Sequence, residues 1–399
     1  MGRMIRADLE ELPGYVPGAS TPGAIKLASN EVAGGPLPSV VAAISDAVAS
    51  VNRYPDNGAT ALVGRLSARL DVPGSRLTVG AGSVALCQQL VQATCGPADE
   101  VLFAWRSFEA YPIISQIAGA GRRTVPLRRD HTHDLAGMLK TITPSTRLIF
   151  VCNPNNPTGT AVRRDELVSF LDAVPDDVLI ALDEAYYEFV TDPHAPDGVA
   201  LGRSRGNLAV LRTFSKAYGL AGLRVGYCVA PEPITATLRK VSVPFSVNSL
   251  AQIAALASLD VEGELLTRCR SVSAERDRVR AELLAMGYPV PDSQANFVWL
   301  PLAEHTASFA EHCREHKIVI RPFPADGARV TISDPTDNDA FLAAASTWPP
   351  RHGDIPGSAE DVHGGHHRVG VVEEVAVVDE AAGEIDEALQ DPHGFAGPR

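Results

Sequence analysis

Lysine is scarce in this chain, which has five lysines against thirty arginines. One of them, Lys216, ends the polar motif Thr213-Phe-Ser215-Lys216, which follows a short hydrophobic segment. Because arginine supplies most of the solvating positive charge, a lysine in such a place indicates amine chemistry, for example a Schiff base with an aldehyde. A single lysine is more often only a surface charge, so the polar residues around Lys216 must decide its interpretation.

Two further polar motifs follow hydrophobic segments in the same way. The motif NPNNPTG (153–159) ends one segment, and Asp183-Glu-Ala-Tyr186 ends the next. In open parallel sheets the carboxyl ends of the strands meet at one edge, and ligands bind there. We therefore expect an amide, a carboxylate, a phenol and the Lys216 amine to surround one crevice.

These residue types match the needs of pyridoxal 5′-phosphate, a cofactor whose ring acts as an electron sink. Asp183 would hold the ring nitrogen protonated, although alone it could equally be a helix N-cap. Asn156 and Tyr186 would hydrogen-bond the ring O3′, although NPNNPTG alone indicates only a turn. The combination favours a cofactor site over any separate interpretation.

The cofactor phosphate requires several donors. In LTVGAGSVALCQQL a strand, a turn of small residues and a helix follow one another, which places the amides of Gly82 and Ser83 at a helix N-terminus that favours anions. Ser215 and Arg224 would complete the phosphate site from the side of Lys216.

Two residues from other segments complete the predicted site. Phe108, in WRSFEAYP, would lie against the cofactor ring, although a lone phenylalanine is more often part of the core. Arg329, in GARVTIS, could bind a substrate α-carboxylate through both guanidinium nitrogens, and a surface ion pair is the alternative. Closure of a small domain over the substrate would then exclude water.

The elements that must position these residues alternate between hydrophobic strands and amphipathic helices, a pattern typical of α/β proteins. We expect a three-layer, mainly parallel sheet with helices on both faces, followed after about residue 245 by a smaller α+β domain. The predicted strands of the large sheet are 77–83, 100–105, 123–127, 147–154, 178–186, 208–215 and 223–230.

The domain boundaries follow from these changes of pattern. An N-terminal arm (1–35) would join the small domain (245–350), and residues 36–244 would form the large domain. Residues 351–399 carry three arginines and eleven acidic residues, a net charge of −8, and we expect them to be mostly disordered with a short helix near 384–389. The histidines of HGGHH in this tail, and of HTHD (131–134), could bind a metal only with further ligands, so we interpret HTHD as a polar loop and assign no metal.

Composition excludes several classes of protein. Hydrophobic residues make up 45% of 399 residues, enough for a full core, and the net charge of −13 argues against a nucleic-acid or anionic-membrane surface. The chain shows no signal peptide and no apolar run long enough to span a bilayer. Six scattered cysteines without a CxxC pair indicate core thiols in a reducing cytoplasm.

Taken together, several motifs resemble the fold-type I pyridoxal-phosphate aminotransferases, and most closely the histidinol-phosphate aminotransferase family. The resemblance covers nearly all of residues 5–348 and implies that Lys216 is the Schiff-base lysine and Asp183 the partner of the pyridine nitrogen. It also implies that Asn156 and Tyr186 are the O3′ ligands and that Phe108 stacks on the cofactor ring. The phosphate environment would consist of Ser83, Thr213, Ser215 and Arg224. The motifs are LASNE (27–31), RYPDNGATAL (53–62), NPNNPTG (153–159), DEAYYEF (183–189), RTFSKAYGLAGLRVGY (212–227) and ANFVWL (295–300).

The resemblance further implies a homodimer, because a tyrosine in the position of Tyr54 reaches the cofactor phosphate of the neighbouring subunit in this family. Tyr15 and Asn30 would line the substrate entrance, and Arg329 would bind the α-carboxylate. The details GYVPG, WRSFEAYP and VPFSVNS resemble the aromatic amino acid aminotransferase branch. We therefore expect transamination of aromatic amino acids with 2-oxoglutarate.

Three alternatives stay open at this point. Histidinol phosphate as substrate would require a second anion site, for which no single arginine stands out in the sequence. A decarboxylase could use the same cofactor, and a non-catalytic binding protein could keep the same fold.

Overall fold

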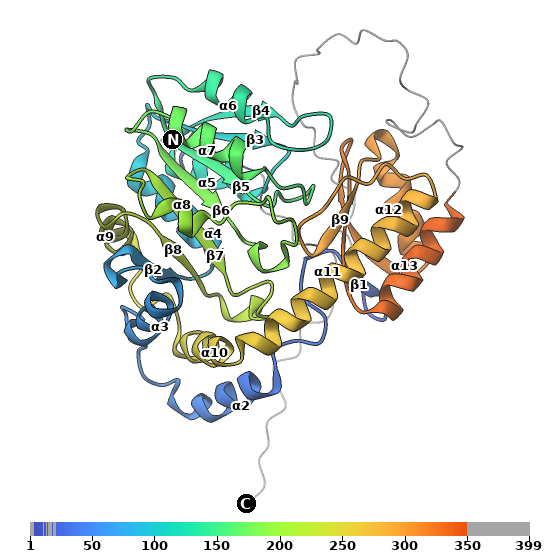
Figure 1. Ribbon diagram of the computed structural model, residues 1–399, viewed down its shortest axis with the longest axis horizontal. Coiled ribbons are helices and arrows are strands. Elements are labelled where there is room, and N and C mark those ends of the chain that lie inside the picture. Colours follow the sequence, from blue (N-terminus) through green and yellow to red (C-terminus); the bar gives the residue numbers. More distant parts are fainter. Residues whose placement is uncertain (1–3, 11, 13, 15–17, 19–20, 349–399) are drawn as a thin grey trace, which may run out of the picture. The chain divides into compact units, whose positions relative to one another are not determined.

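A computed structural model describes residues 4–10, 12, 14, 18 and 21–348 (Figure 1). The acidic tail from 351, its predicted helix and its histidines lie outside the described residues, as does Tyr15. None of the described helices is long and apolar enough to cross a membrane.

A seven-stranded sheet forms the larger part of the structure, and its strands lie in the order β2-β8-β7-β6-β5-β3-β4. Only β8 runs antiparallel to its neighbours, so the predicted mainly parallel sheet is confirmed. Four strands, β2, β5, β6 and β7, end two or three residues earlier than predicted, because the polar motifs that follow them do not pair with neighbouring strands. Their bounds are β2 Leu77–Gly80, β3 Glu100–Trp105, β4 Gly121–Pro126, β5 Thr146–Cys152, β6 Leu179–Asp183, β7 Leu208–Thr213 and β8 Gly226–Val229.

Helices cover both faces of this sheet, because both faces are apolar. Alternate residues of β6 enter opposite clusters: Ile180 and Leu182 join one, and Leu179 and Ala181 the other. Helices α4 (Ser83–Thr94), α5 (Ala110–Ala118) and α9 (Glu232–Val241) pack on the second face. The first face is covered by α3 (Thr60–Leu70), α6 (Leu135–Thr141), α7 (Arg164–Ala173) and α8 (Gly198–Gly202).

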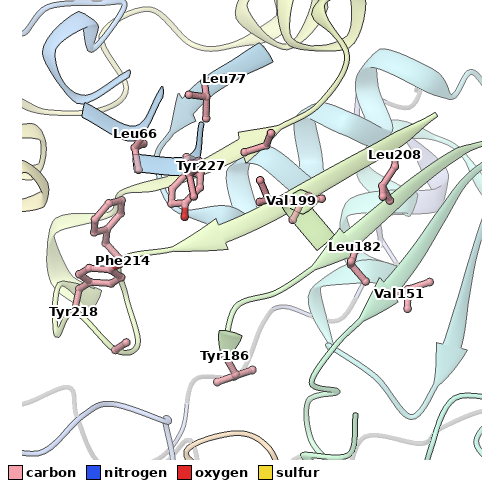
Figure 2. Packing of buried hydrophobic residues seen from close by; sticks show 14 of the residues in the cluster. Leu66, Leu77, Val151, Leu182, Tyr186, Val199, Leu208, Phe214, Tyr218 and Tyr227 are labelled. Atoms are coloured by element: carbon pink, nitrogen blue, oxygen red, sulfur yellow. The ribbon is translucent and has the colours of Figure 1, made fainter. Parts of the chain in front are cut away.

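Figure 2 shows part of the cluster on the first face. Leu66 of α3 lies near Tyr227 of β8, and Leu182 of β6 lies near Val151 of β5 (Figure 2). The sheet is therefore a middle layer with a dry core on each side, as the continuous apolar strands predict.

A second sheet of four strands has the order β1-β10-β11-β9. The N-terminal strand β1 pairs in parallel with β10, so a segment from the start of the chain joins strands from its other end. Helices α11, α12 and α13 pack on one face (Figure 1). The bounds are β1 Ile25–Leu27, β9 Phe297–Leu300, β10 Ile318–Phe323, β11 Gly327–Thr331, α12 Thr306–Glu315 and α13 Pro335–Thr347.

The long helix α11 (Glu262–Ala285) contributes to both parts of the molecule. Leu265 and Cys269 belong to the core of the large sheet, and Val279 and Leu283 belong to the core of the small sheet. The apolar side chains of this helix are therefore buried at its two ends against different sheets. Helix α10 (Ser249–Asp260) packs on α2 (Pro38–Ala47), and α1 spans Ala7–Glu10.

Candidate active site

A cavity opens beyond the carboxyl ends of β5, β6 and β7, where the sequence predicts the crevice. These three strands are neighbours in the sheet, which is why motifs far apart in the sequence meet here. The small sheet contributes the opposite wall through β10 and β11. Predicted residues on the cavity wall are Asn30, Ser83, Phe108, Asn156, Asp183, Tyr186, Thr213, Ser215, Lys216, Arg224 and Arg329.

Lys216 presents its amine in this cavity. Its Nζ donates a hydrogen bond to the backbone carbonyl of Ser29 at 3.2 Å and lies 5.9 Å from the centre of the Tyr186 ring. Burial lowers the pKa of Lys216 to about 7, and the positive charge of Arg329 acts in the same direction. A large fraction of the amine is therefore neutral, and able to act as nucleophile or base, near neutral pH.

Asp183 ends β6, and its buried side chain lies on the cavity wall. One carboxylate oxygen, Oδ2, accepts a hydrogen bond from the Tyr111 hydroxyl at 2.9 Å, whereas Oδ1 has no hydrogen-bond partner among the described residues. Burial raises the pKa of Asp183 to about 6, and the hydrogen bond from Tyr111 opposes that rise. A buried oxygen without a partner is costly, which indicates that a ligand donor completes it.

Tyr111 is a site residue that the sequence analysis missed. Besides donating to Asp183, its ring stacks on Phe150 with centroids 4.3 Å apart and meets Phe108 edge to face at 5.5 Å. It thus fixes both the carboxylate and the predicted stacking ring. Its position on α5 looks like an ordinary core position in the sequence.

The predicted phosphate donors gather around the N-terminus of α4. The hydroxyl of Ser215 accepts a hydrogen bond from Arg224 Nη1 at 3.2 Å and one from Thr213 Oγ1 at 3.0 Å. Gly82 has a φ of +83°, and a Cβ there would overlap the Arg224 guanidinium. Only glycine therefore lets the arginine lie this close to position 82, which precedes Ser83, the first residue of the helix.

The residues predicted for O3′ and for substrate form two hydrogen-bonded pairs. Arg329 donates to Asn156 Oδ1 at 2.5 Å and to the carbonyl of Ala28 at 2.8 Å. Asn30 donates from Nδ2 to the Tyr186 hydroxyl at 2.9 Å. Since the Asn156 carbonyl oxygen is used by Arg329, its NH2 group is the part that can donate to a ligand. Asn30 is buried on the cavity wall, and its place at the substrate entrance stays a prediction.

Behind the cavity, a buried ion pair joins the ends of β6 and β7. Arg212 donates from Nε to Glu184 at 2.9 Å, and its guanidinium lies 3.5 Å from the centre of the Tyr187 ring. Both charged side chains are almost fully buried. Because Glu184 follows Asp183 and Arg212 precedes Thr213, this pair holds the two strand ends in register.

Tyr54 lies elsewhere in this chain. Its side chain is 83% exposed and stacks on Phe245 with ring centroids 4.6 Å apart, in a separate hollow formed by 51–55 and 244–250. The predicted role of Tyr54 refers to a neighbouring subunit, so it stays a prediction.

The motif HTHD lies in a loop, as predicted, but one of its histidines is buried. His133 is buried, and burial lowers its pKa to about 4, so the ring is neutral and packs as part of the core. It adjoins the strand end at Cys152 and the side chain of Asn155, which the sequence pattern does not show. Among the described residues, no three His, Cys, Asp or Glu side chains gather as a metal site would need.

The sequence model of "Aminotransferase class I and II" matches residues 22–344. The chain belongs to this family. It is 59% identical over 342 residues to an aromatic amino acid aminotransferase of Rhodococcus jostii (strain RHA1), with 86% of this chain and 95% of the relative covered. An aromatic amino acid aminotransferase of Streptomyces coelicolor is 56% identical over 348 residues, covering 86% and 97% of the two chains.

The fold also matches a solved structure that contains the predicted cofactor. Histidinol-phosphate aminotransferase from Sinorhizobium meliloti, in complex with pyridoxal 5′-phosphate, has a TM-score of 0.80 at 25% identity, covering 87% of this chain and 97% of that one. The expected family and fold are thereby confirmed, and the chain is a pyridoxal-phosphate-dependent aminotransferase by membership.

Proposed function

We propose that this aminotransferase moves the amino group of aromatic L-amino acids to 2-oxoglutarate, giving aromatic 2-oxo acids and L-glutamate. The observation that carries the proposal is Oδ1 of Asp183, which has no hydrogen-bond partner in the described part of the chain and lies in the same cavity as the low-pKa amine of Lys216. The named relatives, at more than 50% identity over most of the chain, supply the substrate class.

The cavity fits pyridoxal 5′-phosphate at each of its groups. Asp183 would pair with the ring nitrogen, Asn156 and Tyr186 would hydrogen-bond O3′, and Phe108 would lie against the ring. The phosphate would bind at the start of α4, among Gly82, Ser83, Thr213, Ser215 and Arg224. When bound, the cofactor supplies an aldehyde for the amine and a ring that accepts electrons.

The chain's own residues then have distinct tasks. Lys216 Nζ holds the cofactor aldehyde and, once released by the substrate amine, takes the substrate α-proton. Arg329 orients the substrate by its α-carboxylate. Asp183, buried and ionised, keeps the ring nitrogen protonated, while the small sheet keeps water from the reacting atoms.

Histidinol phosphate is the second candidate donor, and one observation favours keeping it. Arg321 of β10, which the sequence analysis did not single out, also lines the cavity and could meet a phosphate. However, it donates to the carboxylate of Glu109 at 2.9 Å. We therefore favour aromatic donors.

The deciding experiment is a matrix of kcat/KM values for phenylalanine, tyrosine, tryptophan and histidinol phosphate with 2-oxoglutarate as acceptor. We expect at least one aromatic donor to exceed histidinol phosphate tenfold or more, since aromatic side chains need no second cation. Carbon dioxide and 2-oxo acid are measured together. A dominant histidinol phosphate value, or release of carbon dioxide in place of 2-oxo acid, contradicts the proposal.

We also propose a homodimer in which Tyr54 reaches the partner's cofactor phosphate. Exposed apolar side chains in the hollow of Tyr54 support it, because a monomer would leave them in water; Val51 and Phe245 line that hollow, and Val48 and Val243 are exposed close to them in the sequence. We expect Tyr54→Phe to weaken cofactor binding about tenfold, with the mass by light scattering still that of a dimer. A monomeric wild-type protein at micromolar concentration contradicts this proposal.

A reducing cytoplasm is the compartment that we propose. The six cysteines are free thiols in the structure, and five of them are buried in its cores. Buried, unpaired thiols are typical of proteins kept in reducing surroundings.

A further inference from the structure

Two arginines face each other across the hairpin of β10 and β11. Arg321 and Arg329 are directly paired in the antiparallel register. Side chains of such a pair leave the same face of a sheet, with Cβ atoms about 4.5–5.5 Å apart. Both residues line the active-site cavity, so the small sheet presents two guanidinium groups to any substrate.

The two guanidinium groups differ in what they contact. Arg329 donates hydrogen bonds to two neutral oxygens, those of the Asn156 amide and the Ala28 backbone. Arg321 instead forms an ion pair with Glu109, and the side chains are only 12% and 30% exposed. Glu109 precedes α5 on the large sheet, so the carboxylate reaches Arg321 from the opposite wall.

Placement of two like charges opposite each other is unfavourable unless a counter-charge is close. A partly buried ion pair is also screened less by solvent than a surface pair. Glu109 therefore cancels much of the field of Arg321 inside the cavity.

We propose that Glu109 is a specificity-determining residue that masks Arg321, so that the cavity selects amino donors with an uncharged distal group. This inference rests on the proposed function and names how its substrate class is selected. A donor with a second anion, whether a phosphate or a distal carboxylate, must displace Glu109 to reach Arg321. An aromatic donor leaves the ion pair in place.

The same reasoning applies to the acceptor. The distal carboxylate of 2-oxoglutarate competes with Glu109 for Arg321, so part of its binding free energy is spent on breaking the ion pair. Removal of the negative charge at Glu109 should therefore tighten binding of every dicarboxylate of this size.

The test uses the holoenzyme and the variant Glu109→Gln, which keeps the size and a hydrogen-bond acceptor but removes the charge. The ratio of kcat/KM for histidinol phosphate to kcat/KM for phenylalanine should rise at least tenfold. The dissociation constant of glutarate, a dicarboxylate that cannot react, should fall at least fivefold by isothermal titration calorimetry.

A matched control is available at the same junction. Arg106 donates from Nε to Asp326 at 2.7 Å and also joins the large sheet to the β10–β11 hairpin, but neither residue lines the cavity. Asp326→Asn should leave the ratio and the glutarate constant within twofold of wild type, because it unmasks no cation in the cavity.

The outcomes separate this inference from the proposed function. The masking role is overturned if Glu109→Gln and wild type have the same ratio of kcat/KM for histidinol phosphate to kcat/KM for phenylalanine and the same dissociation constant for glutarate. This holds even if wild type transaminates phenylalanine. Equal changes in Glu109→Gln and Asp326→Asn overturn it as well, since they indicate a looser junction. The glutarate measurement needs no turnover, so it decides the masking role even if the aromatic donors prove inactive.

Discussion

The variant Lys216→Ala is expected to lower kcat by at least about 10⁴-fold, because proton transfer alone contributes up to about that factor and the covalent hold on the cofactor is lost as well. The fold should persist, since Lys216 contributes one hydrogen bond, to the Ser29 carbonyl, and belongs to no core cluster. Steady-state kinetics and circular dichroism measure the two effects separately.

Two controls sharpen this result. Lys216→Arg retains a positive charge but not a reactive amine, so it should lose as much activity as the alanine variant. Lys240→Ala removes an exposed lysine at the end of α9 and should not change kcat. Borohydride treatment of the wild-type holoenzyme should fix the cofactor on the peptide that contains residue 216. Activity retained in Lys216→Ala, or a label on another lysine, contradicts the assignment.

The variant Asp183→Asn is expected to lower kcat/KM by about 10²-fold to 10³-fold, the range seen when one preorganised electrostatic partner is removed. The amide fills the same space but cannot hold a positive charge on the ring nitrogen. Asp183→Glu should retain more activity, since it keeps the charge and shifts only its position. If Asp183→Asn matches wild type in kcat/KM and in cofactor affinity, Asp183 has no such role.

The pH dependence of cofactor binding tests the same carboxylate. In the cofactor-free protein the pKa of Asp183 is about 6, above its ordinary value. Cofactor binding favours the ionised form, so affinity is full above pH 6 and falls up to about tenfold per pH unit below it. Because the Tyr111 hydrogen bond lowers this pKa, the fall should begin at higher pH in Tyr111→Phe. Fluorescence titration with pyridoxal 5′-phosphate measures both curves.

The sequence was sufficient for those parts of the site that sit at strand ends. Lys216, Asp183 and Asn156 each follow an apolar strand, and the parallel topology makes their convergence predictable. The order of the strands was not predictable from periodicity alone, and neither was the reversed direction of β8. Strand pairing is set by long-range contacts that leave no local pattern.

The residues that the sequence did not reveal owe their roles to contacts with residues far away in the sequence. Tyr111 has the spacing of a core aromatic on α5, and only the fold brings its hydroxyl to Asp183. Arg321 has the pattern of a strand surface until its pairing with Arg329 turns it toward the cavity. His133 lies in a polar stretch of sequence, yet the fold buries it beside Cys152 and Asn155.

The construction of the cavity from two sheets has a consequence for how such an enzyme changes during evolution. The groups for cofactor chemistry stand on the large sheet, whereas Arg321 and Arg329 stand on a hairpin of the small sheet. We therefore expect single substitutions in that hairpin, or at Glu109, to alter which amino donor is accepted. The residues of the large sheet that would hold the cofactor stay unchanged. We expect a duplicated copy of this chain to reach a new substrate specificity in few mutational steps.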